Sequence, residues 1–216
     1  LYLDSDIIIN GDIAKLYNID LQGKLLGAVR DIDFLGNLNV KHGKRMNYAK
    51  TVLKMQNPYD YFQAGVLVLN TKAMREHYTI RQWLTYASNP DFIYNDQDVL
   101  NAHCEGNVLY LPWEWNVVHD CGGRVGNLFV QAPNDIYDAY MKSRNNPKII
   151  HYAGFQKPWT DPDCDFASIY WKYARETPFY ERLLKRVVKA NESQISEGSF
   201  LPKHERAVGE DNPIRK

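Results

Sequence analysis

The sequence predicts an α/β domain built on a largely parallel sheet. Short apolar segments rich in Ile, Val and Leu alternate with segments of helical periodicity, which is typical of α/β domains. With 216 residues, of which 44% are hydrophobic, the chain can form one large domain, or one domain with appendages. Polar residues follow several of the predicted strands, at the ends where such sheets bind ligands.

The first predicted strand is LYLDSDIIIN, residues 1–10, which carries Asp4 and Asp6 within an apolar run. Alternate side chains of an extended chain share a face, so the two carboxylates should point the same way. Two adjacent carboxylates suit Mg²⁺ or Mn²⁺, although a strand entering an Asx-type turn would use the same residues. Because Leu1 is not Met and the sequence opens within a core strand, we expect upstream residues to be missing from this chain.

The segment after this strand predicts two short helices, a second strand and a loop. Asp12 caps a helix that ends at Tyr17, and the apolar run at 25–29 is a buried strand. Residues 33–47 show little periodicity and are rich in Gly, Asn, Lys and His, so we expect a loop there. A short helix over residues 47–55 follows it.

The next strong strand signal is YFQAGVLVLN, residues 61–70. Within it, Gly65 allows close approach of another part of the backbone. Thr71 is the predicted cap of a helix that runs to about residue 87, and Asn95 is the predicted cap of another. Helices therefore follow this strand, as the α/β pattern requires.

The remaining elements complete the predicted domain. Strands are expected at 108–111 and 148–151, and Thr177-Pro178 opens a last helix, since Pro is tolerated in a first helical turn. Residues 1–190 form the predicted domain. The polar segment 191–216, with Ser, Gly, Pro and mixed charge, is a predicted C-terminal tail.

Composition narrows the classes of function. Lys and Arg together number 26, as do Asp and Glu, so no net field favours nucleic acid as a partner. Three widely spaced cysteines without a CxxC pair fit a reducing compartment better than a disulfide scaffold. No apolar run approaches the roughly 20 residues that a membrane-spanning helix needs.

A second candidate site is HYAGFQKPW, residues 151–159, at the end of a predicted strand. A neutral imidazole at His151 can complete a metal site begun by two carboxylates. Gly154 lets backbone approach a ligand, and Lys157 can place a positive charge beside phosphate. A strand entering an ordinary turn, with His151 as a core histidine, is the alternative.

A third cluster is formed by Asn95, Asp96, Gln97 and Asp98. Acidic residues in a first helical turn are stabilised by the helix dipole, so a purely structural role is open. The same side chains could hold a polyhydroxylated ligand or stabilise an oxocarbenium-like transition state. The segment WEWN at 113–116 is either a polar–aromatic patch on which a sugar stacks or part of the core.

Together these segments resemble the family 8 glycosyltransferases, which include bacterial lipopolysaccharide glucosyl- and galactosyltransferases and the glycogenins. The matching motifs occur in order between Tyr2 and Trp159: YLDSDIII, YFQAGVLVLN, NDQDVLN and HYAGFQKPW. The resemblance implies a GT-A fold, a Rossmann-like mixed sheet, mostly parallel, flanked by helices. It also implies transfer of glucose or galactose from a UDP-sugar, with Mn²⁺ (or Mg²⁺) and with retention of anomeric configuration.

The resemblance assigns a cofactor role to residues at both ends of the matched region. Asp4 and Asp6 match the metal-binding carboxylates of the family, and His151 matches the third ligand. Asp4 would also lie near the donor ribose. Gly154 and Lys157 match residues that hold the diphosphate of the donor.

Four further residues are implied in handling the transferred sugar. Asp96 and Gln97 match residues near the anomeric carbon, and Asp98 lies just behind them. Gln63 stands where many members carry Asn, in a segment that contacts the sugar. Retention requires a covalent intermediate, with Asp98 or Gln97 as nucleophile, or attack from the leaving-group face. We favour front-face attack, with Asp96 and Gln97 positioning the sugar.

In the family, the strands that cradle uracil and ribose precede the Asp-x-Asp motif. This sequence does not contain them, so we expect an N-terminally incomplete catalytic domain. The resemblance suggests a saccharide or lipid-linked saccharide of a bacterial envelope as acceptor. It also suggests a cytoplasmic protein, with peripheral contact to the inner face of the membrane left open.

Two alternatives of other kinds stay open at this stage. A phosphatase of the haloacid dehalogenase type also places Asp-x-Asp after a strand, but it usually continues with Gly-Thr, where this chain has Ile7-Ile8. A carbohydrate- or partner-binding module could keep the fold without turnover. The predicted metal ligands argue against that module for the parent protein.

Overall fold

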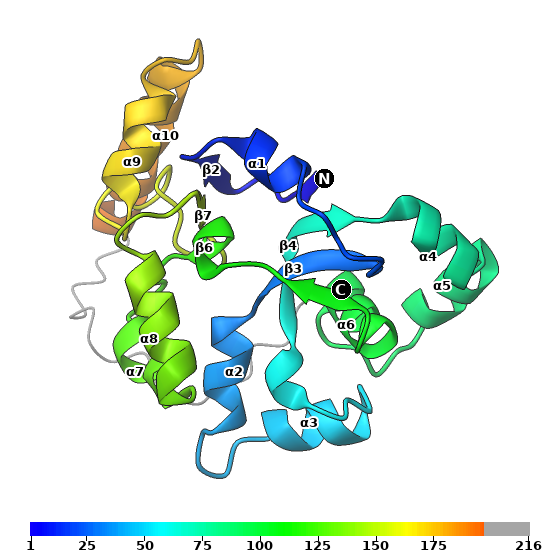
Figure 1. Ribbon diagram of the computed structural model, residues 1–216. Helices are drawn as coiled ribbons and strands as arrows, with labels where there is room; N and C mark the ends of the chain where they lie inside the picture. Colours follow the sequence, from blue (N-terminus) through cyan, green and yellow to red (C-terminus); the bar gives the residue numbers. More distant parts are fainter. Residues whose placement is uncertain (197–216) are drawn as a thin grey trace.

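The computed structural model describes residues 1–196, which form two small β-sheets flanked by helices (Figure 1). The first sheet has the strand order β1-β4-β3-β5 and the second has the order β2-β7-β6. The strands are β1 (Tyr2–Leu3), β2 (Ile7–Ile9), β3 (Leu26–Arg30), β4 (Phe62–Leu69), β5 (Val108–Tyr110), β6 (Val117–Val118) and β7 (Ile149–His151). The predicted α/β class is therefore confirmed.

Both sheets are mixed. The sequence predicted a largely parallel sheet, but antiparallel pairs outnumber parallel ones. The pairs β1–β4, β3–β4 and β2–β7 are antiparallel, whereas β3–β5 and β6–β7 are parallel. Two helices separate β3 from β4, and the chain enters β4 at the same end of the sheet at which it leaves β3, since Phe62 pairs with Arg30. Alternation of strands and helices in a sequence does not by itself determine strand direction, which explains the difference.

The predicted first strand is broken at the Asp-x-Asp motif, and its halves join different sheets. β1 pairs with β4 in the first sheet, and β2 pairs with β7 in the second. Backbone bonds hold the bend between them: Asp4 N–H donates to the Gly65 carbonyl at 2.8 Å, and Tyr152 N–H donates to the Asp6 carbonyl at 2.9 Å. The motif thus lies at the junction of the two sheets. The strand is also less buried than predicted, because Tyr2 is 42% exposed.

Helices cover the sheets and extend the molecule at both ends. In Figure 1, α9 and α10 lie beyond the second sheet, whereas α4 and α5 lie at the opposite end of the molecule. The helices are α1 (Ile13–Tyr17), α2 (Ile32–Leu38), α3 (Arg45–Thr51), α4 (Thr71–His77), α5 (Ile80–Ala87), α6 (Asn95–Cys104), α7 (Arg124–Asn127), α8 (Asn134–Ser143), α9 (Ala167–Ala174) and α10 (Tyr180–Ser196), with short 3₁₀ turns at Pro58–Asp60, Trp113–Trp115 and Phe129–Gln131.

The prediction of a loop over residues 33–47 is wrong for its first half, where the chain forms α2. The Asp31 side chain caps this helix by accepting from Phe34 N–H at 3.0 Å. Ile32, Leu35 and Leu38 are buried at a spacing of three, so one helix face enters the core. The sequence signal was present as a capping Asp followed by this apolar spacing, but Gly and Asn obscured it.

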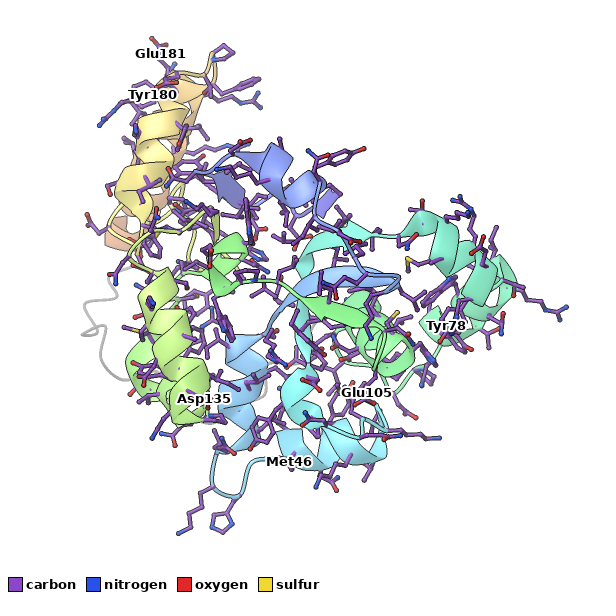
Figure 2. All side chains as sticks on the ribbon, viewed as in Figure 1. Met46, Tyr78, Glu105, Asp135, Tyr180 and Glu181 are labelled. Atoms are coloured by element: carbon purple, nitrogen blue, oxygen red, sulfur yellow. The ribbon has the colours of Figure 1, made fainter. Side chains whose placement is uncertain are left out.

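The long helix predicted to run from Thr71 to about residue 87 is two helices. Asn70 caps α4, and a capping box formed by Thr79 and Gln82 starts α5. Between them Tyr78, labelled in Figure 2, has an extended backbone. Its hydroxyl donates to the carbonyl of His103 in α6 at 2.6 Å. A local cap together with this tertiary contact ends the first helix early.

The C-terminal part contains helices that the sequence pattern did not reveal, α8 and α9. The last helix, α10, begins after the predicted Thr177-Pro178 and runs through residue 190 to Ser196, across the predicted boundary between domain and tail. That boundary stays a prediction, and the rest of the predicted tail, 197–216, lies outside the described residues. Among residues 1–196, no helix combines the length and apolarity needed to cross a bilayer.

All three cysteines are buried and unpaired in this fold. Burial raises the pKa of both Cys104 and Cys164 to about 12, so neither thiol forms the reactive thiolate near neutral pH. We expect the native protein to react with a thiol reagent at pH 8 much more slowly than the urea-unfolded chain. Rapid labelling of a native cysteine would contradict the packing described.

Candidate functional site

The structure brings the three predicted metal ligands together at the junction of the sheets. Asp4 follows β1, Asp6 precedes β2, and His151 ends β7. One ligand atom from each lies within 4.8 Å of the others. His151 Nε2 is 3.3 Å from Asp6 Oδ1 and 3.6 Å from Asp4 Oδ2. Two hard carboxylate oxygens with one imidazole nitrogen fit a divalent cation such as Mn²⁺.

The backbone around Gly65 makes this convergence possible. A Cβ on Gly65 would lie 2.4 Å from His151 Cε1 and 2.6 Å from Asp4 Oδ2. The absent side chain therefore provides the space in which these two ligands meet. The groups that approach Gly65 closely are side chains, where the sequence predicted backbone, and they belong to the candidate metal centre.

Lys157 contacts the same centre from the loop after β7. Its Nζ is 2.5 Å from Asp6 Oδ2 and 2.5 Å from the Tyr152 carbonyl. Half-burial alone would raise the pKa of Asp6, but hydrogen bonds and positive charge from His151 and Lys157 outweigh it and hold the pKa well below its usual value. Asp6 is therefore a carboxylate, the form that binds a cation.

Gly154, in the same loop, has φ +108°, which favours glycine. A Cβ there would lie 2.8 Å from Cys121 Sγ and 3.1 Å from Arg124 Nη2. The loop is thus packed closely against residues 121–124. A contact of Gly154 with a diphosphate stays a prediction.

A cavity of about 210 Å³ opens beside the carboxylates. Among the predicted site residues, Asp4, Gln63, Asp96 and Gln97 line it. The other lining residues are Tyr2, Ala64, Gly65, Tyr94 and Asn95. The fold therefore connects the Asp-x-Asp motif to the NDQD motif, which lies more than 80 residues away in the printed sequence.

Gln97 lines this cavity, and both polar atoms of its carboxamide are hydrogen-bonded within the protein. Its Oε1 accepts from Ala64 N–H at 2.9 Å, and its Nε2 donates to Asp31 Oδ2 at 2.9 Å and to the Tyr61 hydroxyl at 3.2 Å. Burial, aided by the charge of Asp33, raises the pKa of Asp31 to about 6. Gln97 is thus held rigidly, and Asp31 is a supporting residue that sequence reasoning missed.

Asp96 is exposed at the rim of the cavity, in the first turn of α6. Tyr2 lies across from it and donates its hydroxyl to Asp4 Oδ1 at 2.9 Å. This hydrogen bond and the charge of Asp4 raise the pKa of Tyr2, with a smaller contribution from Asp96. The cavity is thus bordered by carboxylates of both motifs.

Asp98, predicted as catalytic, does not line the cavity and is 0% exposed. Its carboxylate accepts from the hydroxyls of Tyr48 and Tyr61, at 2.6 and 2.7 Å. It also accepts from the N–H groups of Ile93 and Tyr94, at 2.8 and 2.6 Å. A carboxylate with four donors and no path to the cavity cannot attack a sugar bound there. The burial and the four donors favour a structural role for Asp98 over the predicted catalytic one.

The WEWN segment belongs largely to the core and is not a sugar platform. Trp115 is buried. Trp113 is partly buried and packs against two clusters of the hydrophobic core, one that contains Tyr140 and one that contains Ile149. Asn116, next in the chain, is 2% exposed and lies between His151 and Gln63. Sequence reasoning gave Asn116 no separate role, because neither spacing nor composition links residue 116 to residues 63 and 151.

Two mixed sheets flanked by helices, with paired carboxylates and an imidazole beside a polar cavity, define an α/β protein with a candidate cation and ligand site. The family model described as glycosyl transferase family 8 matches residues 1–163, and the chain belongs to this family. Membership argues against the phosphatase alternative.

Known relatives agree with this classification. The chain is 27% identical over 165 residues to a lipopolysaccharide 1,2-glucosyltransferase of Escherichia coli (strain K12), covering 74% of this chain and 43% of the relative. It is 30% identical over 180 residues to the glycosyltransferase GlyF of Streptococcus pneumoniae serotype 4, covering 80% and 37%. The chain thus spans less than half the length of these curated relatives.

Solved structures show the same fold. The bifunctional glycosyltransferase WbbM aligns with a TM-score of 0.77 at 30% identity, over 85% of this chain and 34% of that one. The galactosyltransferase LgtC, solved in complex with donor and acceptor sugar analogues, aligns with a TM-score of 0.58 at 24% identity, over 87% of this chain and 60% of that one. The GT-A fold predicted by resemblance is confirmed.

Proposed function

We propose that this chain carries the donor site of a retaining hexosyltransferase. The enzyme moves glucose or galactose from a UDP-sugar to a saccharide or lipid-linked saccharide acceptor of a bacterial envelope. The observation that carries the proposal is the cavity bordered by Asp4 of the candidate metal centre and by Asp96 and Gln97. In a nucleotide-sugar the anionic diphosphate is attached to the anomeric carbon. The candidate cation site at Asp4 would face the diphosphate, and Asp96 and Gln97 would face the anomeric carbon.

Asp4, Asp6 and His151 would hold the cation, because they provide a hard donor set within 4.8 Å. When bound, Mn²⁺ or Mg²⁺ would supply Lewis-acid stabilisation of the negative charge on the departing UDP. Lys157, which already contacts Asp6, would place an additional positive charge beside the diphosphate. Gly154 would let the loop backbone approach the same group.

Asp96 and Gln97 would orient the hexose and stabilise positive charge at its anomeric carbon. Both polar atoms of the Gln97 carboxamide are hydrogen-bonded within the protein, with one lone pair of Oε1 left for the sugar, and Asp98 is buried. Neither is free to form a covalent bond, which favours front-face attack by the acceptor. Gln63 would contact the sugar from β4, at a position where family members often carry Asn.

The identity of the acceptor and the cellular location of the enzyme are part of the same proposal. Related lipopolysaccharide enzymes support an envelope glycan as product, made on the cytoplasmic side. Peripheral contact with the inner membrane would bring a lipid-linked acceptor to the cavity. A binding module with the same fold but no turnover remains the alternative that the following experiment addresses.

Calorimetric titration with Mn²⁺ and then UDP-glucose or UDP-galactose should show binding of the nucleotide-sugar that depends on the metal. His151→Ala should abolish it, because one ligand of three is lost. His42→Asn is the matched control, since His42 is exposed in a loop with a left-handed backbone that Asn tolerates. Binding by the chain without UDP release or transfer would favour the module. Absence of binding, even by a version extended upstream, would refute the transferase proposal.

A further inference from the structure

Asn116 connects the candidate metal centre to the candidate sugar pocket. It follows the 3₁₀ turn Trp113–Trp115, immediately before β6, and is 2% exposed. Its Oδ1 lies 3.1 Å from His151 Nδ1, and its Nδ2 donates to Gln63 Oε1 at 2.7 Å. The oxygen of this buried carboxamide therefore contacts the candidate metal centre, and its nitrogen contacts the candidate sugar pocket.

A backbone group fixes the orientation of this chain of hydrogen bonds. Gly65 N–H, which can only donate, is 2.6 Å from Gln63 Oε1. That atom of Gln63 must therefore be the carbonyl oxygen, because the amide nitrogen carries no acceptor. It follows that the atom of Asn116 facing the same oxygen is its amide nitrogen.

The orientation of Asn116 then determines the state of His151. With Nδ2 directed to Gln63, the oxygen of Asn116 faces the imidazole and can only accept. His151 Nδ1 must therefore carry a hydrogen. The other ring nitrogen, Nε2, faces Asp4 and Asp6 at 3.6 and 3.3 Å. Nδ1 is thus engaged with Asn116, and Nε2 is the ring nitrogen left to coordinate a cation at the candidate metal centre.

The same bonds orient Gln63. Its Oε1 accepts from two donors on the inner side, Gly65 and Asn116, while the side chain lines the cavity. Its Nε2 is then the polar atom available to a cavity ligand. A hydroxyl of a bound hexose is an acceptor of the right kind for such a donor.

We propose that Asn116 is a positioning residue that holds His151 as the Nδ1–H tautomer for metal binding and turns the amide nitrogen of Gln63 to the sugar. The proposal deepens the proposed function and rests on it only for the identity of the ligands. The hydrogen on Nδ1 follows from the hydrogen bonds alone. Outer-shell partners of this kind commonly change metal affinity by about 10–100-fold.

Two substitutions at Asn116 separate its two bonds. Asn116→Ala removes both the acceptor for His151 and the donor to Gln63. Asn116→Asp keeps an acceptor for His151 but removes the donor, so Gln63 loses its fixed orientation. Ser143→Ala is the control for loss of a buried hydrogen bond, because Ser143 is buried and donates to the Tyr140 carbonyl at 2.6 Å, in α8.

The tautomer is measured by NMR on the full chain labelled with ¹⁵N-histidine, without metal and at a pH where the imidazoles are neutral. Loss of one signal set in His151→Ala assigns the residue. We expect the Nδ1–H tautomer in the parent protein, in Asn116→Asp and in Ser143→Ala. We expect a mixture of tautomers in Asn116→Ala.

Calorimetry with Mn²⁺ alone provides the second measurement. Affinity should fall about 10–100-fold in Asn116→Ala and stay within a few-fold in Asn116→Asp. UDP-sugar affinity in saturating Mn²⁺ should fall in both. An Nε2–H tautomer in the parent, or unchanged Mn²⁺ affinity in a folded Asn116→Ala, would overturn this inference and leave the transferase proposal standing. Absence of Mn²⁺ binding by the parent would instead refute the metal site, while NMR still decides the role of Asn116.

Discussion

Gly65→Ala should abolish divalent-metal binding while the protein stays folded. The added Cβ would lie 2.4 Å from His151 Cε1 and 2.6 Å from Asp4 Oδ2, distances at which the neighbouring atoms must move. Asp4 N–H donates to the carbonyl of Gly65 itself. This backbone bond keeps Asp4 beside residue 65, so the added methyl group cannot be accommodated by a shift of β4 away from Asp4. Misplacement by about 1 Å can reduce a rate about 100-fold, and we expect at least that loss of transfer.

The measurement is Mn²⁺ titration followed by an assay of UDP release, with thermal unfolding as the check on folding. Gly126→Ala is the matched control, because Gly126 lies in α7 and a Cβ there would meet no atom within 4 Å. Its metal affinity and activity should equal those of the parent. Normal Mn²⁺ affinity in folded Gly65→Ala would show that the cation binds elsewhere.

Asp98→Ala should be the most destabilising single substitution in the NDQD motif. It would leave the hydroxyls of Tyr48 and Tyr61 and the N–H of Tyr94 without their acceptor. The N–H of Ile93 would keep only the Tyr48 hydroxyl, at 2.9 Å. Removing one side of a buried polar network costs about 3–5 kcal/mol. For a domain of this size, that corresponds to a fall in Tm of about 6–20 °C.

The neighbouring Asp96→Ala should have the opposite profile. Asp96 is exposed at the cavity rim, so its loss should leave Tm nearly unchanged and reduce transfer by about 100-fold, as for loss of one group that stabilises transition-state charge. Urea unfolding and initial rates, measured side by side, separate the two roles. An unchanged stability for Asp98→Ala would restore Asp98 as a candidate catalytic residue.

Several features followed from the sequence without the structure. The strands at 25–29 and 61–70 and the short helix capped by Asp12 appear within one residue of their predicted ends. Asp4, Asp6 and His151 were named as metal ligands, and they converge. Such features are predictable because they depend on neighbouring residues, or on motifs whose spacing the family resemblance interprets.

Other features depend on contacts that close only in the folded chain. The direction of β4 depends on the strand with which it pairs. The division of residues 71–87 into two helices depends partly on the contact of Tyr78 with His103, and the helix at Ile32–Leu38 on burial of one of its faces. The sequence could not separate Asp96 from Asp98. A rotation of about 200° around α6 places one at the cavity rim and the other in the core.

The role of Asn116 shows the same limit most clearly. The sequence alone determined the family, the donor set of the candidate metal centre and the main strands. The tertiary structure alone decided which carboxylate is buried, where Gly65 leaves space and how Asn116 orients His151 and Gln63. The reason is physical: hydrogen bonds and excluded volume act between atoms a few ångströms apart, whatever their distance along the chain.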